Sequence, residues 1–514
     1  MNNQSFFKWM LSISLCLMLF SCSDTKGDTL PNPAIKDGRA KLSGKITNFH
    51  PYGENARMLT LSVPHPVTAE TYKITTEVSE DGSFAFEVLM QCNYTIAYII
   101  PRFDSYDMFG ACLISGKETK MDIVYGETTG AIKSINQSDS IGLTSTDLIN
   151  INKLLNKLIS YSSPGLLTSY AKTPNEYVQR VRISLNNRLK RIAENKILPE
   201  NAKNFLTNEM KLLNLNFNLF RYREGMRNGY LNAGNKDVEN FNPPEPDKKY
   251  YAFLKDFDLN NPQYLYNGYY YCEVLQTILS NDTLNIPPIR DISVDQWMKE
   301  VKSILSKLVG FDKGLFYDML ASNSYARQFD NELKPLSDKQ IENIKNYFTG
   351  EKEDFAKILL RKNEEIIRLA AQKETLVVNE TPAVAKEKLM DAIVSKYHGK
   401  VVVVDFWATW CAPCLDAIQK YRTVKGKLKG KNVVFVYLTN RSSPQKLWKE
   451  KITGIGGEHY YLNDDKEWMQ LMDTFGFEAI PSYVIFDAQG KISHKFTGFP
   501  GNEKMQEMIE KLLP

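Results

Sequence analysis

Residues 401–414 read VVVVDFWATWCAPC, and this stretch decides the fold of the last quarter of the chain. Its first half is a mostly apolar run rich in β-branched residues, which is typical of a strand buried on both faces of a parallel sheet. The cysteine pair Cys411 and Cys414 follows, and residues 415–420 can form a helix. The order of strand, tight turn, cysteine pair and helix predicts an α/β domain with its cysteines at a helix N-terminus.

A C-x-x-C spacing alone is weak evidence for a redox site. The chain has seven cysteines in 514 residues, which give about 0.1 chance pairs at this spacing. Trp410 before the first cysteine and Pro413 before the second lower that expectation to roughly 5 in 100,000. The alternative is half of a zinc site, but no second cysteine pair follows and His459 and His494 are isolated. We therefore expect no metal and no cofactor.

The segment DFWATWCAPC resembles the active site of thioredoxin-fold proteins, and most of all the extracytoplasmic TlpA/ResA-type thiol-disulfide oxidoreductases. The resemblance covers residues 383–514 and implies a thioredoxin-like α/β fold with a redox disulfide between Cys411 and Cys414. It also implies that Pro481 is a cis-proline facing this pair. The alternative is a trans proline that opens an edge strand, where no ladder N–H is needed. The family's roles include cell redox homeostasis and cytochrome c maturation.

The two cysteines should have different tasks. Cys411 would lie at the start of a helix, where unpaired N–H groups and the helix dipole favour a thiolate, so we expect it to attack the substrate disulfide. Cys414 lies one helical turn further on and should resolve the mixed disulfide. The resemblance places four further residues in the substrate groove: Trp410, Ile480, Pro481 and Gly498.

Asp405 lies in an otherwise apolar strand, six residues before Cys411. Burial should raise the pKa of this carboxyl group, which suits a group that exchanges a proton with Cys414 during resolution. Thioredoxins carry an aspartate at the matching position. The alternative is an aspartate that is only hydrogen-bonded at the sheet edge. The chain departs from the thioredoxin pattern at Tyr437, where a lysine is expected near this aspartate.

The N-terminus is typical of an export signal. Lys8 is the only charged residue before Asp24, and it is followed by an uncharged apolar run over residues 9–20. Twelve residues span about 18 Å as a helix, which is too short for a bilayer core of roughly 30 Å. The run ends in LFSC and resembles the lipobox of bacterial lipoproteins, which implies lipidation of Cys22. The alternative is an ordinary cleaved signal with an incidental cysteine.

The rest of the chain predicts two further parts. Residues 40–130 show alternating segments separated by turn signals, which predicts an all-β sandwich, and residues 140–375 show helical periodicity. The sandwich pattern loosely resembles an N-terminal domain fused to TlpA-like lipoproteins of Bacteroidetes. The predicted multidomain chain has a signal peptide at 1–21, a tether at 22–39, the sandwich at 40–130, the all-α region at 140–375 and the thioredoxin-like α/β domain at 383–514.

Three cysteines and a tyrosine cluster in these parts leave alternatives open. Cys92 and Cys112 could pair in an oxidising compartment or stay as buried free thiols. Cys272 could be a buried hydrophobe or have a redox role. The cluster could pack in a core or form a binding face, and it consists of Tyr264, Tyr266, Tyr269, Tyr270 and Tyr271.

The composition excludes several classes of protein. Apolar residues make up 43%, charged residues 24%, and the net charge is +4 with no basic block, so we expect a folded chain that binds no nucleic acid.

The prediction is a lipid-anchored oxidoreductase on the periplasmic side of an inner or outer membrane. It would reduce disulfides of exported proteins with electrons from an upstream thiol donor. The alternatives are a disulfide oxidase or isomerase, or a ligand-binding or partner-binding lipoprotein with an accessory redox domain.

Overall fold

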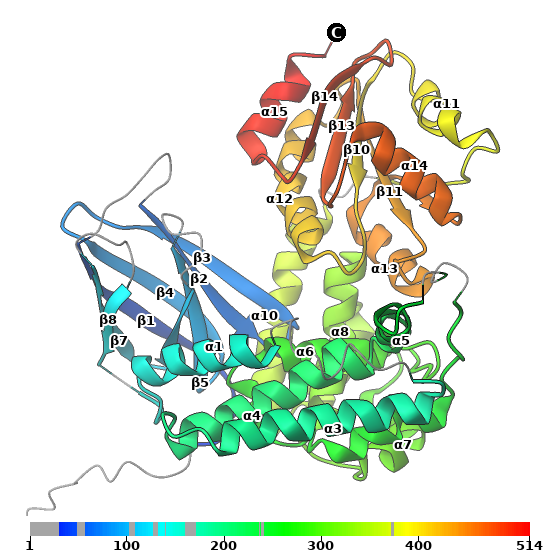
Figure 1. Ribbon diagram of the computed structural model, residues 1–514. Helices are drawn as coiled ribbons and strands as arrows, with labels where there is room; N and C mark the ends of the chain where they lie inside the picture. Colours follow the sequence, from blue (N-terminus) through cyan, green and yellow to red (C-terminus); the bar gives the residue numbers. More distant parts are fainter. Residues whose placement is uncertain are drawn as a thin grey trace, which may run out of the picture.

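The computed structural model describes residues 30–48, 57–101, 108–126, 132–138, 140–159, 171–235, 237, 241–371 and 375–513. A β-rich part, a helical part and an α/β part follow one another along the chain (Figure 1). The predicted signal peptide and Cys22 lie outside the described residues. No helix in the described part has the length and apolar character needed to cross a bilayer.

The β-rich part consists of two four-stranded sheets that share one hydrophobic core. The sheets have the orders β4-β1-β7-β8 and β3-β2-β5-β6. Alternate residues such as Leu42, Leu61 and Phe86 point into the core, as the period of two predicts. The predicted sandwich is thus confirmed in part, with β1 and β7 paired in parallel. The strands are β1 (Ile35–Thr47), β2 (Met58–His65), β3 (Glu70–Glu77), β4 (Ser83–Cys92), β5 (Tyr94–Pro101), β6 (Phe109–Ile114), β7 (Glu118–Tyr125) and β8 (Ile132–Gln137).

Strand β1 begins inside the segment predicted as a tether. Residues 35–39 belong to this strand, where Gly38 pairs with Met90 of β4. Asp37 also forms an ion pair with Arg361 of the helical part. Residues 35–39 are therefore part of a strand and not of a tether. Their polar composition is compatible with a strand because Asp37 pairs with Arg361 of the helical part.

The middle of the chain is helical, as predicted. Its α-helices are α1 (Ser145–Ile159), α3 (Pro174–Ala193), α4 (Glu200–Asn214), α5 (Tyr222–Asn232), α6 (Gly268–Ser280), α7 (Val294–Val309), α8 (Leu315–Glu332), α9 (Asp338–Tyr347) and α10 (Glu353–Ala370). Shorter segments are the π-helical turn Leu215–Leu219 and 3₁₀ helices at Lys248–Asp256, Pro262–Leu265 and Gly350–Lys352. Their apolar faces form one core with residues of the β-rich part, including Cys92 and Ile96.

The structure separates the alternatives for the cysteines and the tyrosines. Cys92, Cys112 and Cys272 are buried free thiols, so the two cysteines of the β-rich part do not pair. Burial raises the pKa of the Cys112 thiol to about 11, which keeps it protonated and unreactive. The tyrosine cluster divides between two places. Three rings are buried in the core, at Tyr264, Tyr266 and Tyr271, and two are more accessible, at Tyr269 and Tyr270.

The α/β part is built on a six-stranded mixed sheet of order β14-β13-β10-β11-β12-β9. Its strands are β9 (Leu376–Asn379), β10 (Val401–Phe406), β11 (Val433–Asn440), β12 (Gly457–Leu462), β13 (Ser482–Phe486) and β14 (Ile492–Thr497). Its helices are the 3₁₀ segment Lys386–Lys388, α11 (Leu389–Ser395), α12 (Ala412–Leu428), α13 (Gln445–Ile455), α14 (Asp465–Phe475) and α15 (Asn502–Glu510).

Strand β9 lies between the predicted all-α region, which ends at residue 375, and the predicted α/β domain, which begins at residue 383. Leu376 pairs with Gly457 of β12, so the segment adds a parallel edge strand to the sheet. The α-helix that follows, α11, covers Leu389–Ser395.

The α/β part docks on the helical part through helices α8 and α13, which lie side by side (Figure 1). Arg327 of α8 forms an ion pair with Glu450 of α13, and Lys451 Nζ lies 3.0 Å from the Asp330 carboxylate. A Cβ atom at Gly454 would lie 2.6 Å from the Asn331 carbonyl oxygen, so the close approach of the two helices requires glycine there.

Candidate active site

The strand that carries the motif lies in the middle of the sheet. All six residues of β10 are buried, and the strand pairs in parallel with β11 and antiparallel with β13. Its β-branched side chains pack on both faces, as an enclosed central strand requires. The chain leaves the sheet after Phe406 and turns into α12, so the residues between them lie at the carboxyl end of a central strand.

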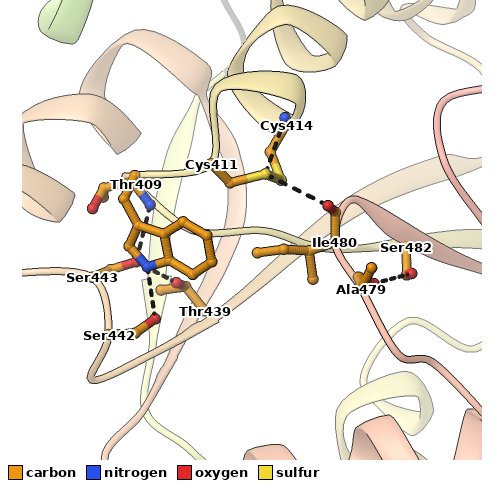
Figure 2. The surroundings of a disulfide bond; sticks show 10 residues. Thr409, Cys411, Cys414, Thr439, Ser442, Ser443, Ala479, Ile480 and Ser482 are labelled. Carbon is orange, nitrogen blue, oxygen red and sulfur yellow. Dashed lines mark hydrogen bonds between the residues drawn. A yellow bond between two sulfur atoms is a disulfide. The ribbon is translucent and has the colours of Figure 1, made fainter. Parts of the chain in front are cut away.

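Cys411 and Cys414 are joined by a disulfide bond at the start of α12 (Figure 2). Cys411 is the N-cap residue, and the backbone N–H of Cys414 points at its Sγ atom at 3.2 Å. Cys411 is 4% exposed and Cys414 is fully buried. An N–H group aimed at Sγ, together with the positive end of the helix dipole, stabilises negative charge on Cys411 after reduction.

Three of the predicted groove residues lie together beside the disulfide. The Ile480–Pro481 peptide bond is cis, as predicted, and the Ile480 carbonyl oxygen lies 3.8 Å from Cys411 Sγ (Figure 2). The backbone N–H of Gly498 donates to the Pro481 carbonyl at 2.8 Å, with Gly498 at a φ of 85°, which favours glycine. The cis-proline loop is therefore held between the disulfide and strand β14.

The fourth groove residue, Trp410, is held by a hydrogen bond to the loop after β11 and not by the cis-proline loop. Its indole N–H donates to Ser442 Oγ at 3.0 Å, and the side chain is 56% exposed. Such exposure of a tryptophan leaves a large apolar face open next to the disulfide.

A hydroxyl network under the active-site turn could not be foreseen from the motif. The Thr409 N–H donates to Ser443 Oγ at 3.0 Å, and Ser443 Oγ in turn lies 2.7 Å from Thr439 Oγ1 (Figure 2). All three residues are buried. The network fixes the turn to the end of β11, and its sequence signal is only two threonines and a serine that are separated along the chain.

Asp405 is deeply buried on the central strand β10 and not at a sheet edge. The residue is 2% exposed, and neither carboxylate oxygen has a hydrogen-bond partner among the described residues. Burial raises the pKa of this carboxyl group well above its usual range, and the positive charge of Lys425 partly opposes that rise. A carboxyl group with a raised pKa keeps its proton to a higher pH than an exposed one and can exchange that proton with a neighbouring group.

The lysine that is missing at Tyr437 is replaced by one from a helix. Tyr437 pairs with Asp405 in the sheet, and Lys425 of α12 is buried with its Nζ donating to Tyr437 Oη at 3.1 Å. The same Nζ donates to the Ile455 carbonyl at 3.2 Å. Lys425 follows Cys411 by about four helical turns, and no local pattern marks it as an inward-facing residue.

His459 completes the buried layer behind Asp405. Its ring stacks on Tyr437 at a centroid distance of 4.8 Å, and its Nε2 lies 3.0 Å from the Gly456 carbonyl. Burial lowers the pKa of His459 to about 3, so the ring is neutral at physiological pH. The histidine, isolated in sequence, is a packing residue here.

The C-terminal quarter of the chain matches a known family. The Redoxin family model matches residues 379–513. The thiol-disulfide oxidoreductase ResA of Geobacillus thermodenitrificans is 27% identical over 121 residues, which cover 24% of this chain and 68% of the relative. ResA of Geobacillus kaustophilus is 26% identical with the same coverage. The chain thus spans about two thirds of these relatives.

A solved structure is similar over a comparable share of the chain. It is the thioredoxin domain of a thiol-disulfide oxidoreductase from Bacteroides vulgatus, with 20% identity and a TM-score of 0.21 over 23% of this chain and 84% of that one. The family match and the ResA relatives agree with the strand, the cysteine pair and the cis-proline described above. The C-terminal part of this chain is therefore a Redoxin domain, and it is a TlpA/ResA-like, thioredoxin-like disulfide oxidoreductase.

Proposed function

We propose that the protein is a membrane-anchored extracytoplasmic oxidoreductase that reduces disulfides of exported proteins. The observation that carries the reducing chemistry is the geometry of the pair. Cys411 caps a helix with an N–H aimed at its sulfur, and Cys414 is buried one turn behind it. This arrangement suits an outer attacking thiolate and an inner resolving thiol.

The proposed reaction has two exchange steps. The Cys411 thiolate attacks one sulfur of a substrate disulfide, which forms a mixed disulfide and releases the first substrate thiolate. The Cys414 thiolate then attacks Cys411 Sγ, which forms the Cys411–Cys414 disulfide and releases the second substrate thiolate. The substrate gains two electrons, and the protein ends in the disulfide form. An upstream thiol donor restores the dithiol by the reverse exchange.

Asp405 is proposed to take the proton of Cys414 in the second step. A thiol must lose its proton before it can attack, and the buried Cys414 has no access to water of its own. The proposal is supported by the raised pKa of Asp405 and by its lack of a hydrogen-bond partner.

Replacing Lys425 by methionine should move the pH dependence of resolution upward. The lysine charge lowers the pKa of Asp405, so its removal raises that pKa and leaves less of the ionised base at a given pH. The acidic limb of the resolution rate should move to higher pH by about one unit. Stopped-flow measurement of the rate from pH 5 to 9 checks this shift. Lys427→Met on the exposed side of α12 is the control, and an unchanged limb in Lys425→Met would contradict Asp405 as the base.

The substrate groove is proposed to consist of Trp410, Ile480, Pro481 and Gly498. The exposed Trp410 offers an apolar surface, and the cis-proline loop lies against Cys411. An extended substrate chain between them would present its disulfide to Cys411 Sγ.

Reduction of insulin by the full chain, with dithiothreitol as electron donor, tests the proposed activity. Catalysed precipitation of the insulin B chain is the expected result. The enzyme proposal fails if the protein neither reduces insulin nor exchanges disulfides with glutathione.

The reduction potential separates the reductase from the alternative of an oxidase or isomerase. A value near about −270 mV indicates a reductant, and one near about −120 mV indicates an oxidant.

In the second alternative, residues 40–375 bind a ligand or partner at the membrane and the redox domain is accessory. A chain without both active-site cysteines would then keep its function in the cell.

The anchor and the location are proposed from the sequence. We propose that Cys22 is lipidated after removal of residues 1–21. Labelling cells with radioactive palmitate should mark the wild-type protein, while Cys22→Ala should lose the label and leave the membrane fraction. A labelled Cys22→Ala protein would contradict this site. A role in cytochrome c maturation stays a prediction of the family resemblance.

A further inference from the structure

A cleft of about 960 Å³ opens where the three parts of the chain meet. One wall is helix α12 of the redox domain, and the facing walls come from strand β3 and helices α1, α6 and α10. The redox domain lies on top of the helical part, with the β-rich part beside it (Figure 1). No segment of the C-terminal quarter alone could form this space.

The cleft begins next to the reactive sulfur. Ala412 and Leu415, from the first turn of α12, line it, and Ala412 directly follows Cys411. Lys73 of β3 lies 3.4 Å from the Asp416 carboxylate of α12, which ties the β-rich part to the active-site helix. A chain that leaves the proposed groove along α12 therefore enters the cleft within a few residues.

Several large and accessible apolar side chains gather in this cleft. Four of them are about 40% exposed, at Tyr72, Met108, Ile159 and Tyr269, although they come from separate elements. Tyr270 and Leu155 add partly buried surface. Concentrated apolar exposure of this kind marks a binding surface, because a folded chain otherwise buries such side chains.

Most charged groups of the cleft are paired with one another. Besides Lys73 and Asp416, Lys362 Nζ lies 2.7 Å from the Glu70 carboxylate. Glu209 is buried in the cleft wall and accepts a hydrogen bond from Asn267 Nδ2 at 2.9 Å. Paired charges create no strong field of one sign, so the cleft favours neither a nucleic acid nor a highly charged ligand.

We propose that this cleft binds the polypeptide segment flanking the substrate's reactive disulfide and selects segments rich in apolar side chains. The inference rests on the proposed function and adds a substrate class to it. The cleft is continuous with the end of α12 that carries Cys411, so a substrate bound at Cys411 would place its neighbouring residues in the cleft. The volume lies at the upper end of the range for small-molecule pockets, which leaves room for several side chains.

Kinetics with a large and a small disulfide test the proposal on the full chain. The variants Tyr269→Ser and Met108→Ser remove exposed apolar surface from the cleft. The matched control is Ile183→Ser, which removes a 62% exposed side chain of α3 that does not line the cleft. Each cleft variant should raise KM for insulin by about tenfold and leave kcat/KM for oxidised glutathione unchanged.

A second readout locates the bound segment. The Cys414→Ser protein joined to insulin B chain through Cys411 should show slower hydrogen exchange in α1 and α6 than the free variant, with α3 unchanged. Equal kinetics of cleft variants and wild type, an equal loss with both disulfides, or no added protection in the complex would each overturn the proposal. A lipid extracted from the cleft of the native protein would also overturn it. A wild-type protein that reduces neither disulfide would instead defeat the proposed function.

Discussion

Replacing Cys411 by serine is expected to slow insulin reduction by about 1,000-fold or more, to the rate without protein. The helix N-terminus around residue 411 favours a sulfur anion, and a serine hydroxyl cannot attack a disulfide under these conditions. Cys414 cannot replace the nucleophile because it is fully buried. The initial rate of insulin precipitation, with dithiothreitol as donor, measures the loss.

Cys272→Ser is the matched control for this loss. Cys272 is a free buried thiol whose Sγ lies 3.5 Å from the Pro66 carbonyl oxygen, and the variant should keep the wild-type rate. A Cys411→Ser protein that still reduces insulin at an appreciable fraction of the wild-type rate would show that another thiol attacks the substrate.

Replacing Asp405 by asparagine should slow resolution of the mixed disulfide by about 100-fold, because a general base typically contributes at least that factor. The first attack by Cys411 should be much less affected, since the helix N-terminus already stabilises its thiolate. Stopped-flow kinetics with a labelled disulfide peptide separates the two steps. Asp473→Asn, an exposed position on α14, is the control.

Stability measurements distinguish a lost base from a damaged fold. The pKa of Asp405 is raised in the folded protein, so the wild type loses stability as the pH rises from the unfolded pKa through the folded one. Asparagine carries no such ionisation. Asp405→Asn should therefore be more stable than the wild type at pH 8, although it is slower. A variant that is both slower and less stable would indicate a structural role.

The C-terminal fold could be predicted because its signals are local. The apolar run 401–404, the motif around Cys411 and the proline at 481 each act through neighbours in sequence, and the structure places them at one site. Alternation of apolar residues likewise predicted strands such as β4, whose burial alternates along much of its length.

Other features depend on contacts that no local pattern encodes. Strand β9 is four residues long and is specified by its pairing with β12, about 80 positions away in the chain. Lys425 is buried because Tyr437 and the Ile455 carbonyl accept its hydrogen bonds. From sequence alone, a lysine late in a helix is expected to face solvent.

The cleft between the three parts of the chain also depends on contacts between residues that are far apart in the sequence. Its walls meet only after the redox domain docks through Arg327 and Glu450. The tyrosine cluster illustrates the difficulty, since Tyr271 packs in the core while Tyr269 on the same helix faces the cleft. Sequence spacing predicts which residues share a face, but the partner of that face is decided by the tertiary arrangement.

Trapping of a mixed disulfide by the Cys414→Ser protein tests the central claim most directly. The full-length variant, mixed with oxidised insulin and analysed without reductant, should form a stable adduct. Mass spectrometry of its peptides should place the bond at Cys411, and the adduct should be absent from Cys411→Ser. An adduct through Cys92, Cys112 or Cys272, or no adduct at all, would contradict the assignment of Cys411 as the attacking thiolate and Cys414 as the resolving thiol.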